Sequence, residues 1–245
     1  MAKYLDAMQR AREQRDQQQG QPPAGQGEQP FESPAAPLPS AGFMMRAAAG
    51  TVSDQLVGLS EAQSPATEQI RHICTNLESM LTETGPRTVV ISSPVGSDGK
   101  TVISANLASV LADTPDHKVI LVDADMRKPR QHDLFGLDRA PGLSEYLQGK
   151  AELDQMVRAT PMPNLSIIPA GRTPAKPTVL LGSERMTALL AELQRRYHWV
   201  LIDTPPLLPV TDATILGREA SGLIMVVRMG QTQDRKSTRL NSSHT

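Results

Sequence analysis

A glycine-rich loop between an apolar strand and an apolar helix constrains the fold of this chain more than any other feature. The loop reads S-P-V-G-S-D-G-K-T over residues 93–101, after the β-branched run 88–92 and before the apolar-periodic run 100–113. Backbone N–H groups of such a turn and the positive end of the following helix both face a bound anion, so the loop predicts a phosphate site. We expect the nucleotide to be contacted by Gly96, Ser97, Asp98, Gly99, Lys100, Thr101 and Val102.

The loop departs from the strict phosphate-loop pattern G-x-x-x-x-G-K-[ST], because Pro94 stands at the first glycine position. In phosphate loops the lysine reaches the β- and γ-phosphates and the next hydroxyl binds Mg²⁺. Lys100 and Thr101 hold those two positions. The alternative interpretation is a glycine turn that only caps a core helix.

Two further apolar strands end in carboxylates. Residues 119–123 end in Asp123, with Asp125 two positions on, and residues 199–203 end in Asp203. Ligands bind at the carboxyl edge of parallel sheets, where paired carboxylates suit Mg²⁺ and the acceptance of a hydroxyl proton. Each could instead be an ordinary strand-end aspartate or a helix cap. The order and spacing of the three motifs favour the nucleotide-site interpretation.

Strands and helices alternate along the chain, which predicts an α/β fold. The strands are continuous apolar runs rather than period-2 patterns, so we expect a mostly parallel sheet with helices on both faces, as in P-loop NTPases. Strands are expected at 88–92, 119–123, 165–168, 199–203 and 223–227, and helices at 100–113 and 186–197.

Composition divides the chain into four parts. Residues 1–60 form a Gln/Pro/Ala-rich extension that we expect to be disordered, because it carries too little apolar surface to offset ordering entropy. Residues 61–85 form a helix ahead of the core, with a helix start at Ser64 and apolar positions at Ile70, Ile73, Leu77 and Leu81. Residues 86–233 form the core. Residues 234–245 are expected to be an artefact, because Asp234–His244 is what the DNA of a short-read sequencing adapter encodes, and the core would then be truncated.

Charge and hydropathy exclude several classes of protein. The formal net charge is −1, which argues against an electrostatic grip on nucleic acid or anionic lipid. The chain has one cysteine, and its longest apolar runs are strand-sized, far below the ~18 residues that span a bilayer. We therefore expect a cytoplasmic protein with no nucleic-acid partner.

The segment 88–228 resembles the catalytic domain of bacterial tyrosine kinases, the P-loop autokinases of polysaccharide biosynthesis. Their second motif, strand-Asp-x-Asp-x-Arg, is matched by Asp123, Asp125 and Arg127. Further matches cover nearly the whole core: Pro129, His132, Phe135, Gly142-Leu143-Ser144, Leu147, Gly149, Pro169, Gly171, Asp203-Thr204-Pro205-Pro206 and Thr211-Asp212-Ala213.

The resemblance implies ATP-dependent phosphorylation of tyrosine hydroxyls, on the chain itself and on sugar-pathway enzymes. ATP and Mg²⁺ are the implied cofactors. Lys100 would bind phosphate, and Thr101 and Asp203 would hold Mg²⁺ with Asp125 close to the metal. The implied partner is a separate membrane chain-length protein, a polysaccharide co-polymerase, that activates the kinase and recruits it to the inner face of the plasma membrane.

The resemblance also implies a catalytic set of Lys100, Asp123, Asp125 and Arg127. Asp123 would accept the tyrosine proton. Arg127 would either stabilise charge or pin its loop.

Two departures from the family pattern leave alternatives open. In the helix ahead of the core, Cys74 replaces the last arginine of the Glu-x-x-Arg-x-x-Arg oligomerisation motif, so a homo-oligomer stays an open expectation. A tyrosine-rich C-terminal tail is absent. One alternative is a partitioning or cell-division ATPase of the MinD/ParA type, although Val95 stands where those proteins carry a signature lysine. The other is a nucleotide-binding regulatory subunit without phosphotransfer.

Overall fold

The computed structural model describes residues 52–56, 64–81 and 85–229. The predicted extension, apart from 52–56, and the predicted artefact tail at 234–245 lie outside the described residues. No helix among the residues that the structure describes is both long and apolar enough to cross a membrane.

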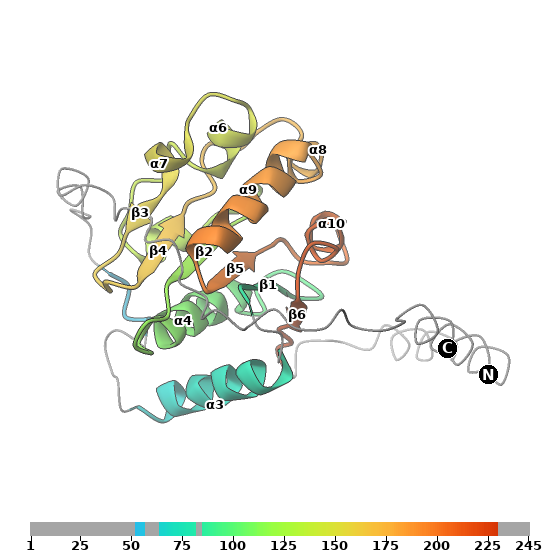
Figure 1. Cartoon of the computed structure of the whole chain (residues 1–245). Coiled ribbons are helices and arrows are strands. Elements are labelled where there is room, and N and C mark those ends of the chain that lie inside the picture. Colours follow the sequence, from blue (N-terminus) through green and yellow to red (C-terminus); the bar gives the residue numbers. More distant parts are fainter. Residues whose placement is uncertain (1–51, 57–63, 82–84, 230–245) are drawn as a thin grey trace, which may run out of the picture. The chain divides into compact units, whose positions relative to one another are not determined.

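A six-stranded sheet forms the centre of the described region (Figure 1). The strand order is β3-β4-β2-β5-β1-β6, and every neighbouring pair is parallel except β3 and β4. The strands are β1 (Arg87–Ser92), β2 (Val119–Asp123), β3 (Arg158–Ala159), β4 (Leu165–Ile168), β5 (Trp199–Asp203) and β6 (Gly222–Met225). The expectation of a mostly parallel α/β sheet is confirmed.

The central strands are buried on both faces, which explains their unbroken apolar sequences. In β1, Val89 and Ile91 belong to one apolar cluster, and Val90 between them belongs to the other. Leu201 in β5 joins the first cluster, whereas Ile202 joins the second. Successive side chains of a strand point to opposite faces, so each central strand contributes to both halves of the core.

One face of the sheet is covered by α4 (Lys100–Ala112), with α3 (Pro65–Met80) packed against α4 (Figure 1). Ser64 caps α3, since its hydroxyl accepts a hydrogen bond from the Thr67 backbone N–H at 3.2 Å. Ile70 and Cys74 are buried against α4, but Ile73, which the helical spacing placed on the apolar side, is 37% exposed. The apolar stripe is thus narrower than the sequence pattern suggested.

The other face is covered by α9 (Glu184–Arg196) together with several short helices (Figure 1). Leu189, Leu190 and Leu193 of α9 are buried in the second cluster. The short helices on this side are α6 (Leu143–Leu147), α7 (Leu153–Met156), α8 (Pro177–Leu181) and α10 (Asp212–Leu216).

Two elements differ from expectation at the margins of the sheet. The predicted last strand, 223–227, is realised as β6 and ends at Met225. Its side chains alternate between half-buried and exposed because Ile224 packs against the first apolar cluster, whereas Leu223 and Met225 point to the opposite face. The two-residue β3 was not anticipated, because so short an antiparallel strand leaves no pattern in the sequence.

Candidate nucleotide site

The glycine-rich loop connects the carboxyl end of β1 to the start of α4. Gly99 precedes the helix with φ of +92°, in the left-handed region that glycine adopts without strain, and it provides no side-chain cap. Ser97 also has a positive φ of 69°. An α-helix leaves its first four N–H groups without partners inside the helix, and its dipole is positive at this end. The start of α4 therefore favours an anion.

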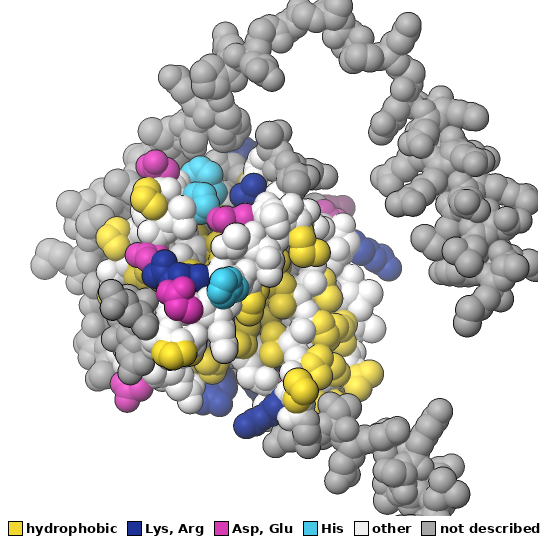
Figure 2. Space-filling model, turned by 90° about the horizontal axis from the view of Figure 1, so that it is seen from below, with side chains coloured by type: hydrophobic (Ala, Val, Ile, Leu, Met, Phe, Trp, Pro, Cys, Tyr) yellow, Lys and Arg dark blue, Asp and Glu magenta, His cyan; other side chains and the backbone are white. Residues whose placement is uncertain are grey.

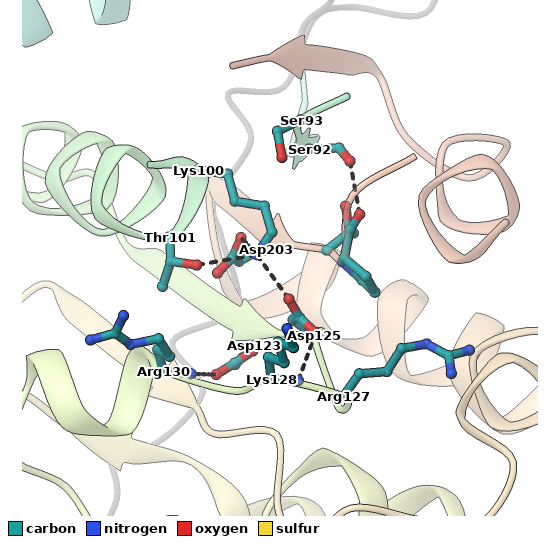
Figure 3. A network of polar contacts seen from close by, with 12 residues as sticks. Ser92, Ser93, Lys100, Thr101, Asp123, Asp125, Arg127, Lys128, Arg130 and Asp203 are labelled. Atoms are coloured by element: carbon teal, nitrogen blue, oxygen red, sulfur yellow. Dashed lines mark hydrogen bonds and ion pairs between the residues drawn. The ribbon is translucent and has the colours of Figure 1, made fainter. Parts of the chain in front are cut away.

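The loop that follows β5 is fastened to the loop that follows β1. The backbone N–H and the hydroxyl of Thr204 both donate to the Ile91 carbonyl, at 3.0 and 2.9 Å. The Ser92 hydroxyl donates to the Pro205 carbonyl at 2.9 Å, and the Leu207 N–H donates to the Ser93 carbonyl at 2.8 Å (Figure 3). These contacts hold two of the predicted motifs side by side.

The Lys100 ammonium lies among oxygens from all three motifs (Figure 3). Its Nζ is 2.9 Å from Asp125 Oδ2, 3.4 Å from Asp203 Oδ1 and 3.2 Å from Thr101 Oγ1. Lys100, Asp125 and Asp203 are all buried. Burial alone would lower the pKa of Lys100, but the Asp203 and Asp125 carboxylates raise it, so the amine stays protonated.

Asp123 is fully buried and holds the turn that follows β2. Its Oδ1 accepts the Asp125 N–H at 3.2 Å, and its Oδ2 accepts the Arg130 and Gln131 N–H groups at 3.2 and 3.1 Å. Burial raises the pKa of Asp123 well above its usual value, and the nearby Asp203 carboxylate adds to that effect. Asp123 pairs with Asp203 in the β2–β5 register, so the two carboxylates end adjacent strands.

The site carries an excess of negative charge. With the carboxylates ionised, Asp123, Asp125 and Asp203 oppose the single Lys100 ammonium, which leaves a formal charge of −2 (three minus one). Burial raises the pKa of Asp203, and the contacts with Lys100, Thr101 and Gln131 oppose that rise. A divalent cation would neutralise this excess, and oxygen donors are what Mg²⁺ prefers.

Arg127 points away from Lys100 (Figure 3). Its Nε is 3.3 Å from Asp212 Oδ2, and its Nη2 donates to the Thr178 hydroxyl at 2.9 Å. The Thr178 hydroxyl in turn donates to Asp212 Oδ1 at 2.6 Å. Arg127 therefore joins the turn after β2 to α8 and α10. Of the two roles left open, this geometry favours pinning the loop.

The remaining predicted contact residues follow the loop and the first turn of α4. Gly96, Ser97 and Gly99 are exposed, and Asp98, Thr101 and Val102 are half-buried. Their contact with nucleotide stays a prediction.

Gln131 is a site residue that sequence reasoning missed. It begins α5 (Gln131–Leu134) and is fully buried, and its amide nitrogen lies 3.0 Å from Asp203 Oδ2. A lone glutamine after a Pro-Arg turn gives no pattern by which it could be found, because its contacts depend on how the chain returns over the sheet.

The protein family described as "AAA domain" matches residues 86–232. The tyrosine-protein kinase wzc of Salmonella typhimurium (strain LT2) is 41% identical over 175 residues, which cover 71% of this chain and 24% of that protein. The tyrosine-protein kinase YwqD of Bacillus subtilis (strain 168) is 36% identical over 184 residues, which cover 75% of this chain and 77% of that protein.

A solved structure of a tyrosine kinase domain is also similar to this chain. The kinase domain of Escherichia coli tyrosine kinase ETK superposes with a TM-score of 0.70 and 33% identity, covering 75% of this chain and 71% of that one. Several of the curated relatives are much longer proteins, and the chain spans about a quarter of the length of wzc.

Proposed function

The chain belongs to the family of bacterial tyrosine-protein kinases, and from that premise we propose that it transfers the γ-phosphate of ATP to tyrosine hydroxyls, its own and those of proteins in exopolysaccharide production. Nucleotide binding follows from the P-loop domain that covers residues 86–232. The observation that carries the proposal is the convergence of Thr101, Asp125 and Asp203 on the Lys100 ammonium.

The β- and γ-phosphates of ATP are proposed to lie at the start of α4. Lys100 would leave the carboxylates and donate to phosphate oxygens, while N–H groups of residues 96–102 surround the phosphates. This exchange replaces one anionic partner of the ammonium by another, so Lys100 keeps a counter-charge throughout. The positive end of α4 favours the same position for the phosphates.

Mg²⁺ is proposed to be held by Thr101 and Asp203, with Asp125 close by. The three oxygens that surround the Lys100 Nζ already form a cation-binding set, because they lie within 3.4 Å of a positive charge. When bound there, Mg²⁺ would supply positive charge that neutralises the charge developing on the phosphates.

Asp123 is proposed as the acceptor of the tyrosine proton. Its raised pKa makes the ionised carboxylate a stronger base than an exposed aspartate. In this conformation it is fully buried and its oxygens accept three backbone N–H groups, so a tyrosine hydroxyl would reach it only after the turn at 124–130 shifts. Asp125, which is nearer to Lys100, contributes charge, and Arg127 anchors the turn.

Phosphate transfer is tested with Mg²⁺, γ-labelled ATP and a poly-(Glu,Tyr) acceptor, followed by phosphoamino-acid analysis, with the purified activator segment of the membrane partner added in parallel. We expect labelled phosphotyrosine that is lost in Lys100→Met, because methionine keeps the length of the side chain without its charge. Lys128→Met is the matched control, since only the backbone N–H of Lys128 has a described contact in the site, with Asp125 Oδ1.

Other outcomes would replace the proposal. ATP hydrolysis without phosphotyrosine, even with the acceptor, indicates an ATPase of the partitioning type. Nucleotide binding without hydrolysis or transfer indicates a regulatory subunit.

We further propose that residues 86–233 act as the kinase core and that residues 61–85 serve self-association. A membrane chain-length protein is the proposed activator, and it would bring the kinase to the inner face of the plasma membrane. Co-purification of the chain with that protein tests the partnership. A failure to co-purify at saturating ATP would contradict the partnership.

A further inference from the structure

Gln131 occupies a buried position where three segments of the site meet. It is the first residue of α5 and has no exposed surface. Its backbone N–H donates to Asp123 Oδ2 at 3.1 Å, so the end of β2 determines where its side chain begins. That side chain then reaches both α4 and the end of β5.

The side-chain amide connects the P-loop helix to the carboxylate of β5. Its Nε2 is 2.8 Å from Ser104 Oγ, 3.2 Å from the Thr101 carbonyl and 3.0 Å from Asp203 Oδ2. A carbonyl and a carboxylate only accept hydrogen bonds, so the nitrogen rather than the oxygen of the amide must face them. The orientation of Gln131 is thus set by its partners.

The two oxygens of Asp203 have different partners. Oδ1 is 3.4 Å from the Lys100 ammonium, and Oδ2 accepts from the Gln131 amide. In the proposed function Lys100 moves to the phosphates, which removes the partner of Oδ1. The Gln131 contact does not depend on that move, because Gln131 begins α5 and Lys100 begins α4, two different elements.

We infer that Gln131 is a positioning residue that fixes the Asp203 carboxylate relative to Thr101, so that the two keep the spacing that Mg²⁺ requires when Lys100 turns to the nucleotide. This inference rests on the proposed function and adds to it a residue that touches neither nucleotide nor metal. Partners that orient metal ligands are worth about 10–100-fold in metal affinity.

The buried oxygen of the same amide bears on whether a variant without the amide can fold. Gln131 Oε1 is buried and has no hydrogen-bond partner within the described residues. A buried acceptor without a partner disfavours the folded state, so methionine in place of the amide removes one unfavourable contribution, which offsets part of the cost of taking a hydrogen bond from Asp203 Oδ2. We therefore expect Gln131→Met to fold.

The test measures Mg²⁺-dependent binding of a fluorescent ADP analogue to the full chain. In EDTA we expect wild type and Gln131→Met to bind the analogue equally. In a Mg²⁺ titration, Gln131→Met should need about tenfold more Mg²⁺ to reach half of the gain in affinity. Gln194→Met is the control away from the site. The Gln194 amide likewise donates an internal hydrogen bond, to Thr88 Oγ1 at 2.9 Å, but Thr88 lies at the opposite end of β1 from the P-loop.

Ser104→Ala is a second variant that keeps the test decisive if Gln131→Met does not fold. It removes the other side-chain partner of the amide, and alanine suits a helix interior. We expect a smaller rise in the Mg²⁺ requirement. A folded Gln131→Met with the Mg²⁺ midpoint of wild type would overturn the inference, as would an equal loss of binding in EDTA and in Mg²⁺. A wild-type chain that gains no affinity from Mg²⁺ would instead overturn the proposed function, and this inference with it.

Discussion

At the scale of single residues, two separate sets of interacting polar side chains lie at the site. The first is the set around Lys100, in which three oxygens enclose one ammonium. The second is Arg127 with Asp212 and Thr178, which lies on the other side of the same turn. Each set includes one residue from the turn that follows β2, Asp125 in the first and Arg127 in the second. This turn therefore connects the nucleotide site to the packing of α8 and α10.

Arg127→Met is expected to destabilise the fold more than to weaken nucleotide binding. It leaves the Asp212 carboxylate, which has no exposed surface, with fewer partners, at a cost of about 1–3 kcal/mol. Urea unfolding measures this cost. The exposed Arg130→Met is the control, because only the backbone N–H of Arg130 has a described contact in the site. A large loss of ADP affinity with unchanged stability would show instead that Arg127 serves the phosphates.

At the scale of elements, short helices depend on side chains that satisfy the backbone at their ends. Glu145 in α6 illustrates this dependence. Its Oε2 accepts the Gly142 N–H at 2.9 Å, and its Oε1 accepts the Arg172 N–H at 3.0 Å. Gly142 is needed there, because a Cβ would lie 2.3 Å from the Pro169 carbonyl. One carboxylate thus fastens α6 to the loop after β4.

Glu145→Gln is expected to lower stability only above the titration range of the carboxylate. Burial opposes ionisation, but the N–H groups of Gly142 and Arg172 favour it more, and the pKa of Glu145 is lowered from its usual 4.5. A lowered folded-state pKa contributes stability above the unfolded value, and that contribution is lost as pH falls through the folded value.

Melting temperatures measured from pH 7 to pH 3 check this expectation. The difference between wild type and Glu145→Gln should be full at pH 7 and should shrink as the pH falls below 4.5. Glu184→Gln is the control, since Glu184 is exposed. A difference that is constant over the whole range would show that charge on Glu145 does not matter.

At the scale of the whole described region, the sheet couples two apolar clusters. Each central strand places alternate side chains in the cluster under α4 and in the cluster under α9. Figure 2, seen from below Figure 1, shows apolar side chains reaching the surface beside scattered charges. Leu223 and Met225 of the edge strand β6 are 46% and 40% exposed, so these two side chains lie outside both clusters.

The two clusters are expected to unfold together. Leu107→Ala in the first and Leu189→Ala in the second should each cost about 2–5 kcal/mol, because both side chains are fully buried. Trp199, the single tryptophan of the chain, lies in the first cluster and reports its unfolding by fluorescence. In urea, each variant should shift the fluorescence and the far-UV circular dichroism transitions equally. Separate transitions for Leu189→Ala would show that the clusters are independent.

The sequence by itself determined the central strands and the order of the motifs. Val119–Asp123 and Trp199–Asp203 have the predicted bounds, because fully buried parallel strands must be apolar throughout and end where polar ligand-binding groups begin. The P-loop, with its lysine and hydroxyl, could be identified from the sequence because its residues are consecutive. The family resemblance was identified from such local motifs as well. The predicted roles of the individual site residues remain predictions.

Only the tertiary structure decided which side chains meet. Arg127 turns to Asp212 and Gln131 to Asp203, across 85 and 72 residues of sequence. These pairings depend on how the turn after β2 returns over the sheet, and Asp123 sets that path by accepting backbone N–H groups. Local patterns encode the period and burial of an element. They do not encode the choice among distant polar partners, since that choice depends on the relative positions of elements that only the folded sheet provides.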